Sequence, residues 1–469
     1  MSIYTLAKYS RIVSRGSDYL IWHHYKGDLC KISKRTKNLI KLVGSDEKAF
    51  EKLNTEEEHI IQFLVDKQVL HCIDASVHDN RVDNLYTLNN KHVPWFKDLK
   101  LAIIKVTDRC NLSCSYCYEM ANIKQGDMKV DLFCKLASEI IKSTKSQYIH
   151  FLFHGGEPTI LPLEWYKKAL NHLKKAASQH KKELLIGMQS NLVNLSLEKM
   201  RLFKKFNLLL SGSLDNPTNP EASMRDKTEN VIRNLLTAQS MGFKTGIILN
   251  INRSNIHEMH NICLWMERNL KNKKFKANIM YPVGSGENID VPTATEIFNA
   301  QKDILHYMIQ TKGETLLETN LCIEIVRFFE NYLEGKQRME KMCHAFNCGA
   351  NKHILAFAPD GKILPCGRFS SHNEGNILGC FNDYHQMNPQ DIQSFYDKKE
   401  SFHRLYQKTM SACKTCDARW ICRYGCKAFI VRTPKLSKIE CQPTLYRLEF
   451  YKQNIADIKI IYEAYISGS

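Results

Sequence analysis

Six apolar, strand-like runs alternate with helical patterns over residues 99–310, and this alternation constrains the fold more than any other feature. The strand-like runs are 101–106, 148–153, 184–188, 208–213, 245–250 and 276–281, and the helical patterns between them are 131–142, 164–175, 197–206, 230–241 and 256–269. Strands that alternate with helices pair in parallel through right-handed crossovers. The sequence therefore predicts an α/β segment with a parallel sheet or barrel, whose site lies at the carboxyl ends of the strands.

The first strand-like run leads directly into three cysteines, Cys110, Cys114 and Cys117. A cubane 4Fe–4S cluster takes four thiolates, so this Cys-x3-Cys-x2-Cys spacing supplies one ligand too few. A structural zinc ion or an electron-transfer cluster needs the fourth ligand. We interpret the loop as a cluster site with one open iron, where a small molecule can bind.

Composition narrows the class of protein. The 469 residues include 17 cysteines and carry a net charge of +17. The sequence shows no secretory signal pattern and no stretch apolar enough to cross a bilayer, so we expect a cytoplasmic protein without membrane contact. Disulfides are rare in that compartment, and so many cysteines favour metal or cluster ligation. The lysines are scattered, which indicates a solvated surface more than a nucleic-acid-binding arm.

A second group of eight cysteines lies within residues 335–445. They are Cys343, Cys348, Cys366, Cys413, Cys416, Cys422, Cys426 and Cys441. Their spacing is Cys-x4-Cys-x12-Gly-x4-Cys, followed by Cys-x2-Cys-x5-Cys-x3-Cys-x14-Cys. A pair of zinc sites is one interpretation, because Cys-x2-Cys alone is typical of structural zinc. A pair of iron–sulfur clusters is the other.

The first cysteine loop resembles the signature of the radical SAM superfamily, in which an aromatic residue, here Tyr116, precedes the last cysteine. The resemblance implies a partial (β/α)6 barrel. It also implies a 4Fe–4S cluster whose open iron is chelated by the amino and carboxylate groups of S-adenosylmethionine (SAM). Reductive cleavage of SAM would then yield a 5′-deoxyadenosyl radical that abstracts hydrogen from a substrate. The cofactor carries this chemistry, while the barrel orients the reactants and excludes water.

A second motif, from His154 to Pro158, follows the second strand-like run and matches the GGEP turn of the same family. The resemblance implies that Gly155, Gly156, Glu157 and Pro158 contact SAM. The glycines would allow close backbone approach, and Glu157 with the local carbonyls would accept hydrogen bonds from the ammonium group. Taken alone, the motif is also compatible with an ordinary strand-to-helix connection.

The ends of the next two strands supply further candidates for SAM binding. Ser190 and Asn191 follow the third strand-like run, Ser213 ends the fourth, and Arg225 lies in the connection after it. The resemblance implies that Ser213 and Arg225 bind the methionyl carboxylate, a task suited to a bidentate guanidinium. A surface salt bridge is the alternative for Arg225.

The second cysteine group resembles the SPASM extension of radical SAM enzymes that carry two complete auxiliary clusters. The implied ligands are Cys343, Cys348, Cys366 and Cys426 for the first cluster, and Cys413, Cys416, Cys422 and Cys441 for the second. We therefore expect three 4Fe–4S clusters, one of them with an open iron. The two auxiliary clusters would serve electron transfer and shape the substrate pocket.

The first 95 residues form a separate α+β pattern without obvious catalytic chemistry. A hairpin-like stretch at 19–25 and 29–32 precedes helical patterns at 36–43 and 55–69. This order resembles the winged-helix leader-recognition domains of peptide maturases, which bind a leader along a sheet edge. An extension that packs on the barrel is the alternative. The predicted domains are 1–95, 99–310 (partial barrel), 335–445 (SPASM) and a C-terminal helix at 446–469.

SPASM enzymes act mostly on peptides or proteins. Sulfatase maturases of this group carry an Asp directly after the cysteine equivalent to Cys366, as the proposed base, whereas this chain has Gly367. Glycine cannot accept a proton. We therefore favour an oxidoreductase that installs a cross-link or related modification in a ribosomally made precursor peptide. The alternative is a sulfatase-type maturase that oxidises a protein Cys or Ser to formylglycine.

Three points stay open at the level of sequence. No catalytic base can be named, and neither can the bond that is formed. The basic charge would suit an acidic electron donor such as a flavodoxin or ferredoxin. It also prompts a third interpretation, a nucleic-acid-binding protein with zinc or clusters, which leaves the missing fourth ligand and the GGEP turn unexplained.

Overall fold

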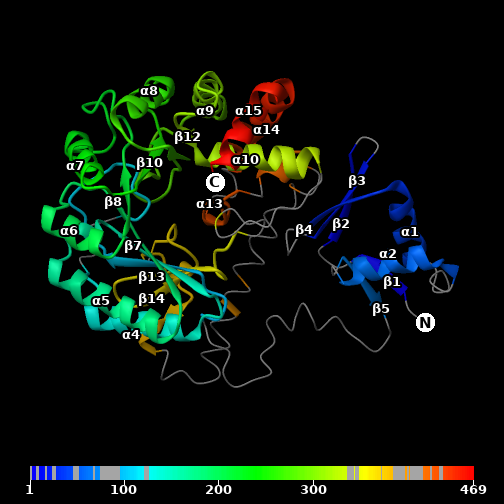
Figure 1. Ribbon diagram of the computed structural model, residues 1–469, viewed down its shortest axis with the longest axis horizontal. Coiled ribbons are helices and arrows are strands. Elements are labelled where there is room, and N and C mark those ends of the chain that lie inside the picture. The colour runs from blue at the N-terminus through cyan, green and yellow to red at the C-terminus, as the bar shows by residue number, and fades with distance from the viewer. Residues whose placement is uncertain are drawn as a thin grey trace. The chain divides into compact units, whose positions relative to one another are not determined.

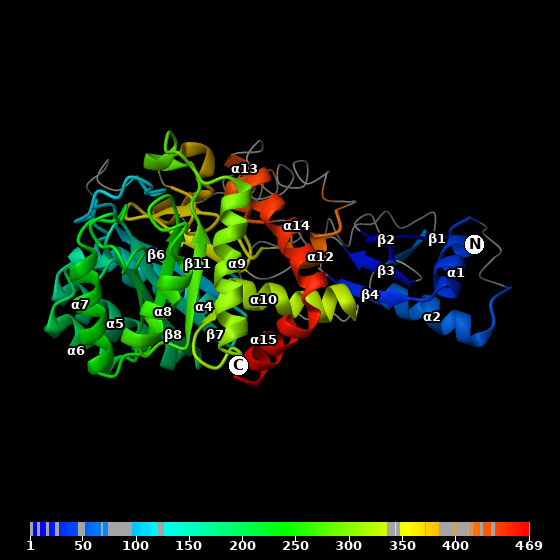
Figure 2. The same cartoon turned by 90° about the horizontal axis from the view of Figure 1, so that it is seen from above.

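The structure is a computed structural model of the chain, drawn as a ribbon in Figures 1 and 2. It describes residues 3–6, 10–15, 18–23, 28–45, 52–66, 69–73, 96–120, 126–334, 343, 348–370, 372–383, 397–398, 401, 413, 416–422, 425–432 and 437–468. The chain divides into two compact units, which are residues 1–93 with 326–348 and residues 94–325 with 349–469.

The first unit combines small antiparallel sheets with helices. Its elements are β1 (Ile3–Leu6), β2 (Ser10–Arg15), β3 (Asp18–His23), β4 (Asp28–Ile32), α1 (Lys34–Ser45), α2 (Thr55–Asp66) and β5 (Leu70–Ile73). β1 pairs with β5, and β3 lies between β2 and β4. A cluster of buried side chains, including Ile21, Leu39, Ile61 and Leu70, joins strands and helices into one core.

The hairpin predicted over residues 19–25 and 29–32 is confirmed as the antiparallel pair β3 and β4. The helix predicted over residues 55–69 ends earlier, at Asp66. The Val69 N–H bonds to the Leu64 carbonyl at 2.8 Å, and β5 begins at the next residue.

Six parallel strands form the centre of the second unit and follow one another in chain order. They are β6 (Leu101–Thr107), β7 (Tyr148–Gly155), β8 (Glu183–Ser190), β9 (Leu209–Ser213), β10 (Thr245–Ile251) and β11 (Lys274–Ile279). The helices between them are α4 (Val130–Ser143), α5 (Leu163–Gln179), α6 (Leu197–Lys205), α7 (Thr228–Ser240) and α8 (Met259–Asn269). The predicted strands and helices of this segment are confirmed, and with them the α/β class.

The core of this unit lies between the sheet and the helices that surround its outer face (Figures 1 and 2). Side chains along β7 alternate between buried and partly exposed positions. On the buried side, Phe153 packs edge-on against Trp165 and Tyr166 of α5, with ring centroids 5.9 and 5.6 Å apart. The inner side is more polar, and Lys105 of β6 lies in register with His154 of β7 there.

The sheet continues beyond the six strands at both edges. β12 (Leu317–Glu318) joins β11, and β13 (Ile354–Phe357) joins β6, followed by β14 (Lys362–Leu364) and β15 (Gly379–Cys380). The strand order is linear, so the barrel is open, as a partial (β/α)6 barrel requires. β13 lies between β6 and β14, and Cys366 comes two residues after β14. The next residue, Gly367, packs against the Ile103 side chain of β6.

Helices of the C-terminal region pack on the open side of the barrel. They include α9 (Ala294–Gln310), α10 (Thr319–Arg327), α12 (Arg419–Cys422), α13 (Lys427–Arg432), α14 (Ser437–Gln453) and α15 (Ile455–Ser467). Arg447 of α14 forms a buried bidentate pair with Glu324 of α10, at 2.6 and 2.7 Å. The single helix predicted over 446–469 is wrong, because Asn454 leaves the helical conformation (φ −122°, ψ 37°) and separates α14 from α15.

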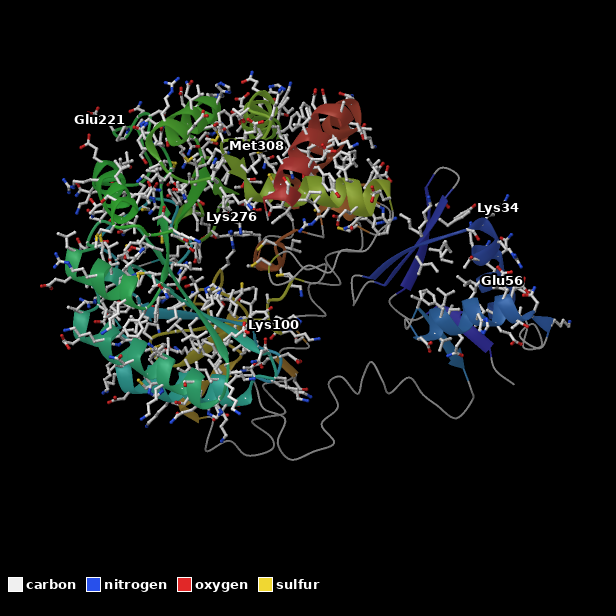
Figure 3. The ribbon with its side chains drawn as sticks, viewed as in Figure 1. Lys34, Glu56, Lys100, Glu221, Lys276 and Met308 are labelled. Atoms are coloured by element: carbon white, nitrogen blue, oxygen red, sulfur yellow. The ribbon has the colours of Figure 1, made fainter. Side chains whose placement is uncertain are left out.

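Charged side chains are spread over the outer surfaces of both units. Lys34 and Glu56 project from the exposed faces of α1 and α2, and Glu221 is exposed on the second unit (Figure 3). Within the part of the chain that the structure describes, no helix combines the length and apolar character needed to span a bilayer.

Candidate functional site

The three cysteines of the first group lie in one loop, which begins where β6 ends. Cys110, Cys114 and Cys117 are each partly exposed, and the Cys117 N–H bonds to the Cys114 carbonyl at 3.2 Å. Burial raises the pKa of the Cys110 thiol to about 11, and the Glu157 carboxylate and the other two thiols add to the effect. Asn191 lies between Cys110 and Glu157, because its side-chain nitrogen is 3.8 Å from the Cys110 sulfur and its backbone N–H donates to Glu157 Oε2.

The three free thiols of this loop are a donor set that fits a 4Fe–4S cluster with one open iron. Among the described residues, no three His, Cys, Asp or Glu side chains converge so as to hold one ion. In a cubane each iron takes its own thiolate, so the sulfurs need not converge on one point, as they must at a structural zinc. The backbone around the loop is also tightly packed, since a Cβ on Gly284 would lie 2.6 Å from the Cys117 carbonyl oxygen.

The GGEP turn is joined to the start of this loop by backbone hydrogen bonds. The Gly156 N–H bonds to the Thr107 carbonyl and the Glu157 N–H to the Arg109 carbonyl, each at 2.8 Å. Gly155 has φ +126°, and a Cβ there would lie 2.4 Å from the Thr107 carbonyl oxygen. Only glycine fits this position without moving β6.

Glu157 is almost fully buried and orients the neighbouring candidates. Its Oε1 accepts hydrogen bonds from the Thr159 N–H at 2.8 Å and the Ser190 hydroxyl at 2.7 Å. Its Oε2 accepts from the Asn191 N–H at 2.6 Å. Burial raises the pKa of Glu157, while these donors lower it. The carboxylate therefore fixes the end of β8 against the turn, a structural role that the sequence did not indicate.

Asn191 connects this arrangement to the cysteines. Its side-chain amide donates to the Asn111 side-chain oxygen at 2.7 Å and lies 3.8 Å from the Cys110 sulfur. Ser190 and Asn191 therefore stand beside the cysteine loop, at the carboxyl end of β8, where the strand order led us to expect them.

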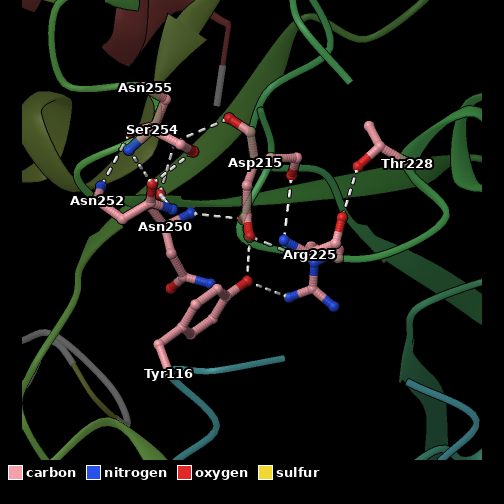
Figure 4. A network of polar contacts seen from close by, with 9 residues as sticks. Tyr116, Asp215, Arg225, Thr228, Asn250, Asn252, Ser254 and Asn255 are labelled. Atoms are coloured by element: carbon pink, nitrogen blue, oxygen red, sulfur yellow. Dashed lines mark hydrogen bonds and ion pairs between the residues drawn. The ribbon is translucent and has the colours of Figure 1, made fainter. Parts of the chain in front are cut away.

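On the other side of the loop, Tyr116, Asp215 and Arg225 form a buried network (Figure 4). Burial raises the pKa of Tyr116 well above its usual range, so its hydroxyl is protonated and donates to Asp215 Oδ2. Arg225 donates to the Tyr116 oxygen at 2.8 Å and to Asp215 Oδ2 at 3.3 Å. The surface salt bridge considered for Arg225 is therefore excluded. Ser213, also buried, ends β9 two residues before Asp215.

Asp215 is the functional candidate that sequence reasoning missed. Its Oδ1 accepts from the Asn250 N–H at 3.0 Å, and its carbonyl accepts from the Asn255 side chain at 2.9 Å (Figure 4). It thereby ties the cysteine loop to the ends of β9 and β10. A carboxylate just beyond a parallel strand was the signal that could have identified it.

The second cysteine group is partly assembled among the described residues. The Cys416 N–H bonds to the Cys413 carbonyl at 3.3 Å, and the Cys422 N–H bonds to the Ala418 carbonyl at 2.8 Å. Burial raises the pKa of the Cys413 thiol to about 11. Cys426 packs against the cluster of Tyr281, Val283 and Phe429, which also contacts Tyr118. The Tyr118 hydroxyl donates to the carbonyl of Gly367, the residue after Cys366, at 3.1 Å. Cys343 and Cys348 belong to the first compact unit.

Comparison with known proteins agrees with this geometry. Residues 104–266 match the family model of the Radical SAM superfamily. The chain contains a radical SAM domain. The serine-type anaerobic sulfatase-maturating enzyme of Bacteroides thetaiotaomicron is 34% identical over 132 residues, which are 27% of this chain and 31% of that enzyme. The cysteine-type enzyme of Clostridium novyi is 22% identical over 352 residues, 71% of this chain and 88% of that enzyme.

Solved structures extend the likeness beyond the radical SAM domain. Native anSMEcpe with bound AdoMet and Cp18Cys peptide has a TM-score of 0.62 at 18% identity, over 78% of this chain and 99% of that one. Streptococcus suis SuiB bound to S-adenosylmethionine has a TM-score of 0.51 at 14% identity, over 91% and 96%. At these identities the likeness concerns the fold.

Proposed function

We propose that the chain is a SAM-cleaving enzyme that modifies a peptide or protein substrate. The observation that carries this proposal is the cysteine loop, held at the end of β6 between the GGEP turn and the Asp215 network. Cys110, Cys114 and Cys117 would hold the 4Fe–4S cluster. When bound, the cluster and SAM supply one-electron chemistry that removes a hydrogen atom from a substrate C–H bond.

The chain's own residues would orient SAM. Gly155, Gly156, Glu157 and Pro158 would line the amino group, with Ser190 and Asn191 beside them. Tyr116, Ser213 and Arg225 would lie on the carboxylate side. Arg225 is preorganised for this by Asp215 and Tyr116, which accept hydrogen bonds from its Nε and Nη2.

The eight cysteines of the second group would hold two auxiliary clusters with the ligand sets expected from the SPASM spacing. Support comes from the hydrogen bond between the Cys416 N–H and the Cys413 carbonyl. Tyr118 adds to it, because its ring packs with Cys426 and its hydroxyl bonds to the residue after Cys366. The basic charge of +17 suits an acidic flavodoxin or ferredoxin as reductant.

We favour a precursor-peptide maturase that installs a cross-link or related modification. Gly367 supports this choice, since it lacks the carboxylate expected of a sulfatase maturase. A Cβ on Gly367 would lie 2.9 Å from Ile103 Cδ1, so the packing against β6 also leaves little room for an aspartate. The sheet of β2, β3 and β4 in the first unit supports a leader-binding role, because an edge strand such as β2 or β4 can pair with an extended peptide.

The second candidate is a sulfatase-type maturase. It is favoured by the similarity to the Bacteroides and Clostridium enzymes and by the fold shared with anSMEcpe, which was solved with a bound peptide. The two candidates differ in product. A hydrazide probe labels the formylglycine aldehyde, whereas a cross-linked peptide loses the mass of two hydrogen atoms and stays unlabelled.

Anaerobic reconstitution tests the proposed function directly. We expect about 12 iron and 12 sulfide per chain for three cubanes, and reductive formation of 5′-deoxyadenosine from SAM. Cys114→Ala should abolish that product. The control is Cys380→Ala, a partly exposed cysteine outside both groups, which should retain it. Iron-replete wild-type protein without 5′-deoxyadenosine would contradict the proposal, and stoichiometric zinc would contradict the clusters.

A further inference from the structure

A fully buried lysine, Lys105 of β6, is not among the residues proposed to bind SAM. Lys105 is 0% exposed, and its ammonium donates to both oxygens of Glu119 at 2.7 and 2.6 Å and to the Phe369 carbonyl at 2.6 Å. Glu119 is 2% exposed. Removing both charges from water costs free energy, so such a pair adds little net stability compared with apolar side chains. The pair instead specifies which segments of the chain lie next to one another.

That arrangement joins three separate segments. Lys105 belongs to β6, Glu119 comes two residues after Cys117, and Phe369 comes three residues after Cys366. The ammonium group therefore links the end of the SAM-cluster loop to the segment that follows a proposed auxiliary ligand.

A second polar link runs parallel to the first. The Gly155 N–H bonds to His154 Nδ1 at 2.7 Å, which assigns the ring proton to Nε2 in the neutral imidazole. Burial lowers the pKa of His154 to about 4, and the nearby Lys105 charge contributes to this lowering, so the ring is neutral. Nε2 then donates to the Tyr118 oxygen at 3.4 Å, and the Tyr118 hydroxyl donates to the Gly367 carbonyl at 3.1 Å.

Contacts with aromatic rings add to these two polar links. Arg368 lies over the Phe429 ring at 5.2 Å, and Phe429 stacks on Tyr281 with ring centroids 3.4 Å apart. Tyr118 and Cys426 pack against this same cluster. Tyr118 and Glu119, the two residues just after Cys117, are thus both linked to the segment that follows Cys366. Tyr118 bonds to Gly367, and Glu119 is linked to Phe369 through Lys105.

We propose that Lys105, Glu119 and Tyr118 are positioning residues that hold the segment after Cys366 against the residues after Cys117. They thereby set the place of the first auxiliary cluster relative to the SAM site. This inference rests on the proposed function, because it takes Cys117 and Cys366 as ligands of different clusters. The consequence is functional, since electron transfer between two centres weakens steeply with their separation.

The first test measures how strongly the amides of residues 366–370 are protected from hydrogen exchange, and this measurement needs no cofactor. In Lys105→Met/Glu119→Leu the charges are replaced by apolar side chains of similar size, so no buried charge is left unpaired. Hydrogen exchange of the amides in residues 366–370 should accelerate roughly tenfold, because the Phe369 carbonyl loses its partner. The matched control is Lys168→Met/Asp131→Leu, which removes an exposed ion pair of the same unit and should leave that exchange unchanged.

Tyr118→Phe gives a second, milder variant, since it deletes one hydroxyl and keeps the ring. It should also accelerate exchange in residues 366–370, by a smaller factor than the double variant. Tyr307→Phe, which loses a hydroxyl bonded to Thr315 at a site away from this link, is its control. Wild-type exchange rates in both site variants would overturn the positional role.

The second test uses the reconstituted holoenzyme. The electron paramagnetic resonance signal of the reduced auxiliary clusters should change in Lys105→Met/Glu119→Leu and stay unchanged in Lys168→Met/Asp131→Leu. An unchanged signal in the site variant would overturn the link to the cluster. If wild-type protein neither binds iron nor cleaves SAM, the proposed function fails, whereas the exchange test still decides the positional role.

Discussion

Two buried carboxylates, Glu157 and Asp215, flank the Cys110 loop. Different groups offset the cost of burying their charges. Glu157 accepts hydrogen bonds from amide and hydroxyl donors of its own turn and of the end of β8. Asp215 forms an ion pair with Arg225 and accepts from Tyr116 and the Asn250 amide. The donors to Glu157 are all neutral, whereas Asp215 also faces the Arg225 guanidinium cation. Asp215 pairs with a buried cation and Glu157 does not. We therefore expect removal of the carboxylate charge to cost more folding stability at Asp215 than at Glu157.

The largest expected effect is that of Asp215→Ala. The substitution leaves the Arg225 guanidinium buried without its counter-charge, which costs about 3–5 kcal/mol in comparable cases. We expect the free energy of unfolding, measured by urea denaturation, to fall by that amount. The exposed Glu221 provides the control, and Glu221→Ala should unfold like the wild type. A loss below about 1 kcal/mol would mean that Arg225 reaches water instead and that Asp215 does not hold it.

A third buried carboxylate extends the comparison to a site with backbone donors. Glu318 accepts from the Ala277 and Leu321 amides at 2.7 and 2.6 Å, and burial raises its pKa from 4.5 to about 7. Below pH 4.5 the group is neutral in both the folded and the unfolded state. Between pH 4.5 and 7 the unfolded chain loses its proton and the folded chain keeps it, so stability falls as the pH rises.

The effect should be on the order of 3 kcal/mol, because each tenfold difference in proton affinity between the two states corresponds to about 1.4 kcal/mol. Glu318→Gln cannot titrate, so the wild type should lose that much stability relative to the variant between pH 4.5 and 7. Urea denaturation at several pH values measures the difference. Glu314→Gln, at an exposed position of the same segment, should retain the wild-type pH dependence. Parallel pH profiles for the wild type and Glu318→Gln would refute the prediction.

The separation of contacting residues along the chain explains what the sequence could predict. Apolar periodicity located the strands from β6 to β11 and the helices between them, since that signal is carried by neighbouring residues. The GGEP turn and the cysteine loop were also recognisable, because each is one short segment. Helix ends were less certain, as the early end of α2 and the break at Asn454 show.

Long-range polar pairs could not be predicted. Lys105 sits within an apolar run, and nothing in the sequence marks Glu119 or the Phe369 carbonyl, 264 residues away, as its partner. The roles of Asp215 and Glu157 were hidden for the same reason. Their partners come from strand ends that meet only in the folded sheet.

The smallest of the three effects is expected for Glu157→Gln. The variant keeps the size and one acceptor oxygen, but its amide group must face donors such as the Asn191 N–H or the Ser190 hydroxyl. An unsatisfied buried donor costs about 1–3 kcal/mol, less than a buried cation without a partner. Urea denaturation measures this loss, with the exposed Glu164→Gln as control. A loss as large as that of Asp215→Ala would show that charge at Glu157, and not its neutral donors, holds the loop. A loss near zero would show that the turn does not depend on its carboxylate, and the orientation of Ser190 and Asn191 would then need another cause.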